Sequence, residues 1–342
     1  KKFWKKKFGK EILEEKKNIT LIFIAALWPM AMIHPAFAES PHFRDISQKI
    51  ERISSGLVGH MGVAAQEIGT ETRIALNGDE AFVMASTFKV AVAVTLLDRV
   101  DQGQIKLSDL IDISPEMMVA GPNPIVQNFV HPGVKLSIAN LIEVMITESD
   151  NTAADICLKL AGGPAAVTKK LRSIGILEQR IDRYGVELLQ DFYGLPTRGY
   201  ASAVVEAVTK DPTLLARIPN RNIEFEIDPR DQTTPNAMLD LLLAIDSGEV
   251  LGNKSREFLL ASMSRTRTGG ARLKGLLPRG ALVAHKTGTL GGVANDVGFI
   301  TLPDGRRFAI AVFTKSSATP EDDRERAIAE VSRTIYDNYY LE

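Results

Sequence analysis

This chain of 342 residues has one cysteine, two tryptophans and almost no net charge. Its single cysteine, Cys157, excludes an intramolecular disulfide framework and a zinc cage made of thiolates. The formal net charge is only −1, from 41 basic and 42 acidic residues, so the charge balance gives no reason to expect nucleic acid as a partner. Hydrophobic residues make up 45% of the chain, which argues against a disordered protein and against a membrane protein with several spans.

Both tryptophans lie in the first 38 residues, a segment that differs from the rest of the chain. Its lysine-rich start is followed by the apolar run Ile19–Ile33 and by the sequence Pro35-Ala36-Phe37-Ala38. A basic stretch, an apolar stretch and an Ala-x-Ala site predict a signal peptide over 1–38 that is cleaved after Ala38. The alternative is a membrane anchor, but the apolar run is shorter than the roughly 18–20 residues that a spanning helix needs.

Removal of this leader changes the charge of the protein. The leader holds eight Lys and three Glu, so its loss takes five positive charges from a net of −1 and leaves −6. We therefore expect a mildly acidic mature protein, residues 39–342, that is periplasmic or secreted and does not stay in the membrane. Nothing in the sequence requires more than a monomer.

The order of the predicted elements indicates a sheet that is built from both ends of the chain. Helical spacing predicts an amphipathic helix over 43–58, and hairpin patterns predict strands over 61–68 and 73–76. Strands are predicted again near the other end, over 281–285, 297–302 and 308–314, followed by a long helix over 321–340. The predicted helices between these two groups span 86–100, 137–147, 151–161, 164–174, 200–209 and 235–246.

This order predicts an α+β fold, an antiparallel sheet of about five strands with a helical subdomain inserted into it. The sheet lobe would comprise residues 39–85 and 236–342, and the helical lobe residues 86–235. The helix over 86–100 is apolar on nearly every side after its first turn, so we expect it to be buried at the centre of the molecule.

Three short polar strings lie at the boundaries of predicted elements: Ser86-Thr87-Phe88-Lys89, Ser149-Asp150-Asn151 and Lys286-Thr287-Gly288. The first opens the most apolar helix, where residues three apart share a face. Burial there would lower the pKa of the lysine so that it accepts the serine proton, while free backbone N–H groups face a developing oxyanion. Taken singly, the strings have structural explanations as well: a capping serine with a solvated lysine, a helix N-cap, and a strand that ends in a turn.

Together and in this order, the three strings are typical of class A β-lactamases and penicillin-binding proteins. The chain resembles a class A serine β-lactamase over about residues 45–342, and the predicted fold is similar to that of the family. Other stretches that match the family are Asn77-Gly78-Asp79, Gly133-Val134-Lys135-Leu136, Thr234-Pro235-Asn236-Ala237-Met238, Thr268-Gly269 and Asn295-Asp296-Val297-Gly298.

The resemblance implies a catalytic role for several matching residues. Ser86 would be the nucleophile that becomes acylated, and Lys89 would be its proton partner. Ser149 would pass a proton to the lactam nitrogen as that nitrogen leaves. The backbone N–H groups of Ser86 and Thr289 would form the oxyanion hole.

The resemblance also implies a set of substrate-binding residues. Asn151 would hold the side-chain amide of the substrate, while Lys286 and Thr287 would bind its carboxylate. Gly288 would let the backbone approach the substrate closely. Arg272 matches an arginine that some members of the family place beside this carboxylate, and the alternative is a surface arginine on the loop before the strand. No metal ion and no organic cofactor are implied.

The resemblance breaks at the glutamate with which class A enzymes activate water on their Ω loop. The family pattern is Arg-x-Glu-x-Glu-Leu-Asn, but this chain reads Arg183-Tyr184-Gly185-Val186-Glu187-Leu188-Leu189. The first glutamate is therefore Gly185, and the loop from Glu187 to Thr234 is longer than the family usually has. We expect Glu187 to act as the replacement base, with Glu224 and Glu226 as further candidates, and we expect Arg183 and Asp231 to pair at the neck of the loop.

The residues that acylation needs are all present, whereas the usual base for deacylation is absent. We therefore predict an exported serine hydrolase that opens β-lactams, with water, to substituted β-amino acids through an acyl-Ser86 intermediate. One alternative is a penicillin-binding protein that is acylated with little turnover. A second alternative is a D,D-peptidase that acts on cell-wall peptides.

Overall fold

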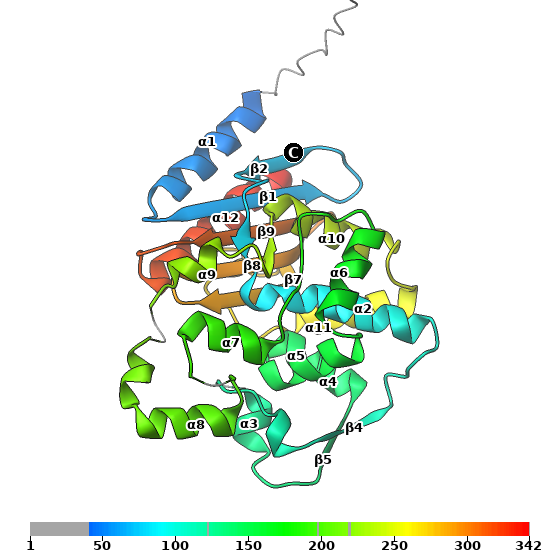
Figure 1. Ribbon diagram of the computed structural model, residues 1–342. Helices are drawn as coiled ribbons and strands as arrows, with labels where there is room; N and C mark the ends of the chain where they lie inside the picture. The colour runs from blue at the N-terminus through cyan, green and yellow to red at the C-terminus, as the bar shows by residue number, and fades with distance from the viewer. Residues whose placement is uncertain (1–40, 122, 197, 218–219, 342) are drawn as a thin grey trace, which may run out of the picture. The chain divides into compact units, whose positions relative to one another are not determined.

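The computed structural model describes residues 41–121, 123–196, 198–217 and 220–341 (Figure 1). Residues Glu39–Glu342 form one compact unit. The predicted signal peptide lies outside the described residues. Within those residues no helix combines the length and the hydropathy that a membrane span requires.

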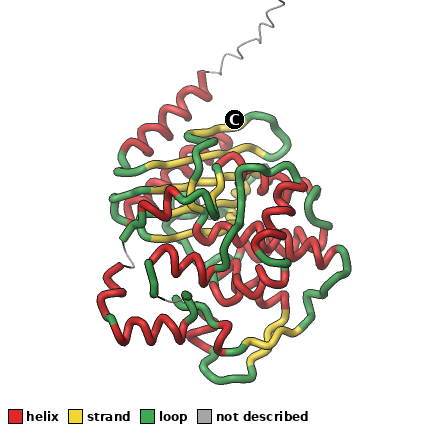
Figure 2. Tube along the Cα trace, viewed as in Figure 1, coloured by secondary structure: helices red, strands yellow, loops and turns green. Residues whose placement is uncertain are grey.

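A five-stranded antiparallel sheet in the order β2-β1-β9-β8-β7 forms the centre of this unit (Figures 1 and 2). Its strands are β1 (His60–Glu67), β2 (Arg73–Leu76), β7 (Leu282–Leu290), β8 (Val293–Thr301) and β9 (Arg307–Lys315). The two ends of the chain meet where β1 pairs with β9, with Val63 opposite Val312. The predicted α+β fold and its sheet of about five strands are confirmed.

The sequence prediction was wrong about where β7 ends. The strand was predicted over 281–285, before Lys286, Thr287 and Gly288, but β7 continues through them to Leu290, with Lys286 opposite Val297. The chain reverses at Gly291-Gly292, where Gly292 has φ +76°, a conformation that favours glycine. Buried polar residues had hidden the strand pattern. The string therefore lies along β7, which is an edge strand of the sheet.

Helices cover both faces of the sheet (Figure 1). On one face α1 (Pro41–Ser55) and α12 (Glu321–Leu341) enclose an apolar cluster that includes Ile50 and Ile335. On the other face α10 (Pro235–Ser247) packs against β1 and β9. The largest apolar cluster lies on this second side and joins the sheet to the helical part of the molecule.

The helical part is arranged around α2 (Lys89–Asp101), whose residues 89–97 are all buried, as the sequence predicts. A short 3₁₀ helix, η1 (Ala85–Phe88), precedes α2. The helices that pack against α2 are α4 (Ile138–Thr147), α5 (Asn151–Leu160), α6 (Pro164–Ser173) and α11 (Asn253–Ser264). The smaller elements are β3 (Phe82–Val83), β4 (Leu110–Ile113), η2 (Pro115–Met117), α3 (Pro124–Asn128), β5 (Val134–Ser137) and β6 (Gln232–Thr233).

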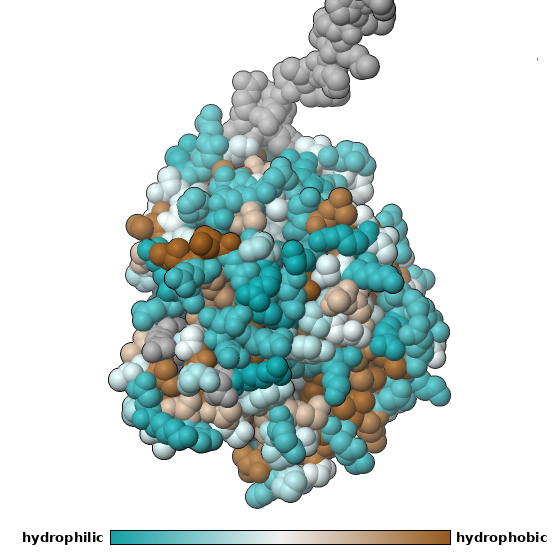
Figure 3. Space-filling model, viewed as in Figure 1, coloured by the Kyte–Doolittle hydropathy of each residue, from teal (hydrophilic) through white to brown (hydrophobic). Residues whose placement is uncertain are grey.

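The long loop predicted after Glu187 is largely helical. It comprises α7 (Gly185–Tyr193), α8 (Ala201–Lys210), η3 (Pro212–Arg217) and α9 (Ile223–Ile227). We call residues 194–227 the insert. Hydrophilic side chains cover most of the face seen in Figure 3, and an apolar patch lies over α9, where Ile227 is 75% exposed.

Two sets of contacts hold this segment in place. The predicted pair at its neck is confirmed, because Arg183 Nε donates to Asp231 Oδ2 at 2.5 Å and both side chains are buried. The start of the insert is fixed to the loop after η2, where Ala120 N donates to Gly199 O and Ala201 N donates to Met118 O, each at 2.8 Å.

Candidate active site

Ser86 lies in the tight turn between β3 and α2. The preceding residue, Ala85, has φ +46°, which is unusual for a residue with a side chain, and it lines the cavity together with Ser86. Asn295 holds this turn from β8, because its Nδ2 donates to the carbonyls of Val83 and Met84 at 2.9 and 3.0 Å. Ser86 itself is only partly buried and lines a mainly apolar cavity.

Lys89 lies one turn after Ser86 and is fully buried. Its Nζ donates to the Ser149 carbonyl at 2.7 Å, to Asn151 Oδ1 at 2.7 Å and to Ser149 Oγ at 3.2 Å. Burial lowers the pKa of Lys89 to about 8, although the charges of Asp150 and Asp155 raise it. The burial predicted for this lysine is therefore confirmed, although its amine has polar partners, and a usable fraction of the amine is unprotonated near neutral pH.

The Ser149 hydroxyl lies between two buried lysines. Besides the bond from Lys89, its Oγ accepts a hydrogen bond from Lys286 Nζ at 2.9 Å. Burial and the positive charge of Lys89 lower the pKa of Lys286 well below its usual range. A hydroxyl oxygen has two lone pairs, and both of these face an N–H donor here. The hydroxyl hydrogen of Ser149 is thus available only as a donor to a third group.

The edge strand β7 lies directly beside the Ser86 turn. A Cβ atom on Gly288 would lie 2.6 Å from the Met84 carbonyl oxygen and 3.1 Å from the Ser86 nitrogen, so only glycine allows this approach. Thr287 is buried, and its Oγ1 lies 2.6 Å from Thr268 Oγ1. Thr289 is the next exposed residue on the strand. The predicted partners on β7 are therefore brought to the nucleophile.

Arg272 is not the surface residue that one interpretation of the sequence suggested, because only 3% of it is exposed. Its Nη1 donates to the Gly288 carbonyl at 3.0 Å, and its Nη2 donates to Thr289 Oγ1 at 2.7 Å. Its Nε donates to the Glu325 carboxylate at 2.8 Å. Arg272 therefore lies behind the end of β7 and orients Thr289.

Asn151 and Asp150 begin helix α5 at the opposite side of the site. The Asp150 carboxylate caps the helix, accepting from Ala153 N at 2.8 Å. The Asn151 side chain lines the cavity, and its Oδ1 is bound by Lys89. The structural interpretation of this string as an N-cap is correct for Asp150, while Ser149 and Asn151 face the site.

None of the acidic residues predicted to replace the missing glutamate lines the cavity. Glu187 Oε2 accepts from the backbone N–H of Tyr184 at 3.0 Å, so this carboxylate caps α7. Glu224 is exposed, and Glu226 is buried against the Ser316 hydroxyl. None of the described residues that line the cavity is acidic. A base role for Glu187 stays a prediction, and it would require the carboxylate to leave the helix cap.

Asp155 is a carboxylate that the sequence analysis missed. It lies four residues after Asn151, hence on the same face of α5, and this spacing was the only signal in the sequence. Its Oδ1 accepts from Gly185 N at 2.6 Å and its Oδ2 from Val186 N at 3.1 Å. Burial raises the pKa of Asp155 to about 6, although the two backbone hydrogen bonds and Lys89 lower it.

Gly185 separates this carboxylate from the cavity. A Cβ atom on Gly185 would lie 2.9 Å from Asp155 Oδ1, so the absence of a side chain leaves room for Asp155. Gly185 itself lines the cavity. Position 185, where the family pattern has glutamate, is thus next to the carboxylate of Asp155, which comes from helix α5.

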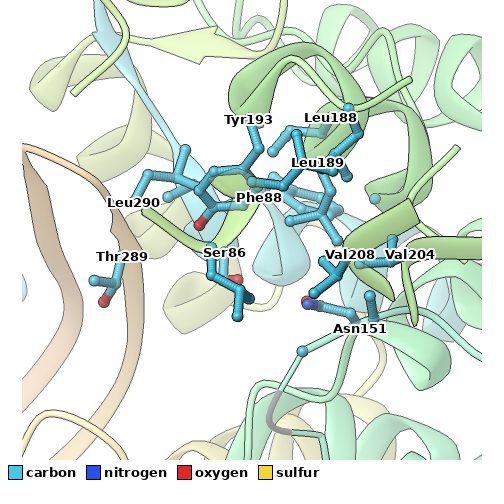
Figure 4. Close-up of a pocket in the computed structure, with 17 residues that line it drawn as sticks. Ser86, Phe88, Asn151, Leu188, Leu189, Tyr193, Val204, Val208, Thr289 and Leu290 are labelled. Atoms are coloured by element: carbon cyan, nitrogen blue, oxygen red, sulfur yellow. The ribbon is translucent and has the colours of Figure 1, made fainter. Parts of the chain in front are cut away.

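The cavity beside Ser86 has a volume of about 310 Å³ and is mainly apolar. Figure 4 shows Thr289 on one side of Ser86, and Leu189, Val204 and Val208 on the other. The side of the cavity away from Thr289 is formed by α7 and the insert; its residues, which we call the apolar chamber, are Leu188, Leu189, Val204, Val208, Leu214 and Leu215. In the part of the chain that the structure describes, no cluster of side chains is suited to a metal ion.

Comparison with known proteins identifies the family of the chain. Residues 45–339 match the model of the β-lactamase enzyme family. The chain belongs to this family. β-Lactamase VEB-1 of Pseudomonas aeruginosa is 30% identical over 306 residues, which cover 87% of this chain and 91% of VEB-1.

Solved structures of β-lactamases show the same fold. The crystal structure of the TLA-1 extended-spectrum β-lactamase gives a TM-score of 0.74 at 27% identity, over 87% of this chain and 99% of that chain. An ancestral class A β-lactamase, GNCA, gives a TM-score of 0.71 at 34% identity, over 85% of this chain and 99% of that chain. The class A assignment is confirmed, whereas the roles of individual residues in this β-lactamase family member stay predictions.

Proposed function

We propose that this protein is an exported serine hydrolase that opens β-lactams through an acyl-Ser86 intermediate and releases substituted β-amino acids. The observation that carries the proposal is the Ser149 hydroxyl, which accepts from both Lys89 and Lys286 and can therefore only donate its proton. Opening a β-lactam requires such a donor, because the lactam nitrogen must be protonated as its bond to the carbonyl carbon breaks.

Acylation would proceed by attack of Ser86 Oγ on the lactam carbonyl carbon. The free amine of Lys89 accepts the serine proton, and the ammonium that results donates to Ser149 Oγ, which gives that proton a path toward the lactam nitrogen. The N–H groups of Ser86 and Thr289 stabilise the oxyanion, as the close contact between Gly288 and the Ser86 nitrogen allows.

Substrate binding would use the charged and polar edge of the site. Lys286 and Thr287 bind the substrate carboxylate, and Asn151 binds its side-chain amide. Arg272 acts through Thr289: because Thr289 Oγ1 accepts from the guanidinium, its hydroxyl hydrogen is free to donate to the carboxylate. A carboxylate held at this edge places the lactam ring over Ser86.

Hydrolysis of acyl-Ser86 requires a base, and we assign this role to Asp155 rather than to Glu187. With a pKa of about 6, Asp155 is mostly ionised at neutral pH and is more basic than an ordinary aspartate. A water molecule beside Gly185 would lie between this carboxylate and the cavity. Glu187 likewise accepts from a backbone N–H at the start of α7, and we favour Asp155 because its carboxylate lies against Gly185, which lines the cavity.

A second candidate function is a β-lactam-binding protein that becomes acylated and hydrolyses little. It is favoured by the absence of an acidic residue among the described residues that line the cavity. Purified mature protein mixed with a chromogenic cephalosporin separates the two functions. Multiple turnovers at a steady rate support the hydrolase, and a stoichiometric burst that stops supports the binding protein. If the Ser86→Ala variant reacts as fast as the unaltered protein, both proposals are wrong.

Export is tested separately. Expression of the full chain in a Gram-negative host, fractionation, and N-terminal sequencing should place a protein that begins at Glu39 in the periplasmic fraction. A protein that keeps its first 38 residues in the membrane fraction would instead indicate an anchor.

A further inference from the structure

The apolar chamber is more extensive than recognition of a small polar substrate requires. Four of its six residues, Val204, Val208, Leu214 and Leu215, come from α8 and η3 of the insert. Val204 and Val208 are one turn apart on α8 and both face the cavity (Figure 4). Val205, between them, points away and is 66% exposed. The helix therefore presents a defined apolar face to the nucleophile.

We propose that this chamber binds an unbranched apolar acyl chain, and that the protein cleaves simple esters of medium-chain carboxylic acids at Ser86. The inference rests on the proposed function, since it uses Ser86 as the acyl acceptor. It adds a substrate class, because an ester of this kind lacks the lactam ring, the carboxylate and the side-chain amide.

The size and polarity of the chamber support this occupant. A water molecule accounts for about 30 Å³ of liquid volume and a methylene group is of similar size, so 310 Å³ holds on the order of ten chain atoms. No described residue that lines the cavity carries a charge. The cavity, of which the chamber is one side, therefore has room for an acyl chain of about eight carbons and leaves no ionised group unpaired.

The chemistry uses the groups already described. Ser86 Oγ forms a bond to the ester carbonyl carbon, and the bond from that carbon to the alcohol oxygen breaks. The serine proton passes through Lys89 and Ser149 to the departing alkoxide. Water then cleaves acyl-Ser86, so that one ester and one water give one carboxylic acid and one alcohol.

The test is the rate of Ser86 acylation by p-nitrophenyl esters with acyl chains of two, four, six and eight carbons. Release of p-nitrophenol gives the rate, intact mass gives the adduct, and Ser86→Ala gives the background. Each buried methylene should raise the second-order rate constant about fourfold, the equivalent of about 0.8 kcal/mol, until the chamber is full.

Two variants on helix α8 show whether the chamber causes this dependence of the acylation rate constant on the length of the acyl chain. Val208→Asp places a carboxylate in the chamber and should reduce the dependence to less than about twofold per methylene. Val205→Asp adds the same charge on the outer face of α8 and should leave it unchanged. Equal dependence in the two variants, or equal rates for the two-carbon and eight-carbon esters, would overturn the inference.

The β-lactam reaction of the same preparations distinguishes failure of this inference from failure of the proposed function. If a chromogenic cephalosporin acylates Ser86 but no ester does, the chamber inference is wrong and the proposed function stands. If neither reagent acylates Ser86, both are wrong.

Discussion

Replacing Asp155 with asparagine should change acylation and deacylation in opposite directions. The substitution keeps the size of the side chain and removes its charge. Deacylation loses its base and should slow by about 10²–10⁴-fold. Acylation should speed up, because the charge of Asp155 raises the pKa of Lys89 and its removal lets that pKa fall below about 8.

The increase in the acylation rate has an upper limit. With a pKa of about 8, about one tenth of Lys89 is free amine at pH 7. Even complete deprotonation of Lys89 would therefore increase acylation by no more than about tenfold. Acyl-enzyme should consequently accumulate in Asp155→Asn, which intact mass measured after rapid quenching would detect.

The pH dependence gives a second readout. The base must be ionised, so deacylation of the unaltered protein should rise as the pH increases through about 6 and then level off. Acylation should rise through about pH 8, as Lys89 loses its proton. Asp155→Asn should remove the first rise and retain the second, shifted to lower pH. A purely structural role for Asp155 would leave the pH at which deacylation rises unchanged.

Matched variants control for loss of structure. An asparagine at 155 keeps only one of the two acceptor oxygens that Gly185 N and Val186 N use, so the melting temperature has to be measured alongside the rates. Glu187→Gln should weaken the cap of α7 and leave deacylation within a few-fold. Gly185→Glu combined with Asp155→Ala removes the side chain that a Cβ atom at 185 would meet, places a carboxylate next to the cavity and should restore deacylation. If Asp155→Asn turns over normally while Glu187→Gln accumulates acyl-enzyme, our assignment of the base is wrong.

Three further outcomes follow from the packing. Gly288→Ala brings a methyl group within 2.6 Å of a backbone carbonyl at the nucleophile turn, so acylation by a cephalosporin should fall about 10²-fold in stopped-flow measurements; an unchanged rate would contradict the geometry. Arg183→Ala breaks a buried ion pair and should cost about 3–5 kcal/mol in chemical denaturation, whereas Arg326→Ala, at an exposed pair, should cost less than about 1 kcal/mol. Cys157 is fully buried and its pKa is raised, so thiol reagents should label it only after unfolding; fast labelling of the folded protein would refute this.

The sequence predicted those features in which neighbouring residues carry the signal. The helices over 137–147 and 151–161 appear as α4 and α5 with small shifts, because their apolar spacing is regular. The proximity of Ser86 to Lys89 likewise follows from one helical turn. The strand through Lys286 was cut short in the prediction, because its buried polar residues interrupt the apolar pattern, and only pairing with β8 shows where it ends.

Features that depend on distant packing could not be predicted from the sequence. Asp155 resembles any polar residue on an amphipathic helix until α7 is packed against it. Glu187 was expected at the site, but its position three residues after Tyr184 favours a cap of its own helix. The apolar residues of α8 likewise become part of the site only when the insert lies over the cavity.

The pairing of β1 with β9 has a consequence for how the chain acquires its structure. The two strands lie near opposite ends of the chain, with the helical part and most of the sheet between them in the sequence. The central sheet therefore cannot be completed until the ribosome has synthesised the last strand. Contacts of such long range form slowly, so we expect the nascent polypeptide to stay unfolded for long enough to be compatible with the export that we propose. Truncation before β9 would leave β1 with an unpaired edge, and such a fragment should aggregate rather than fold into a smaller domain.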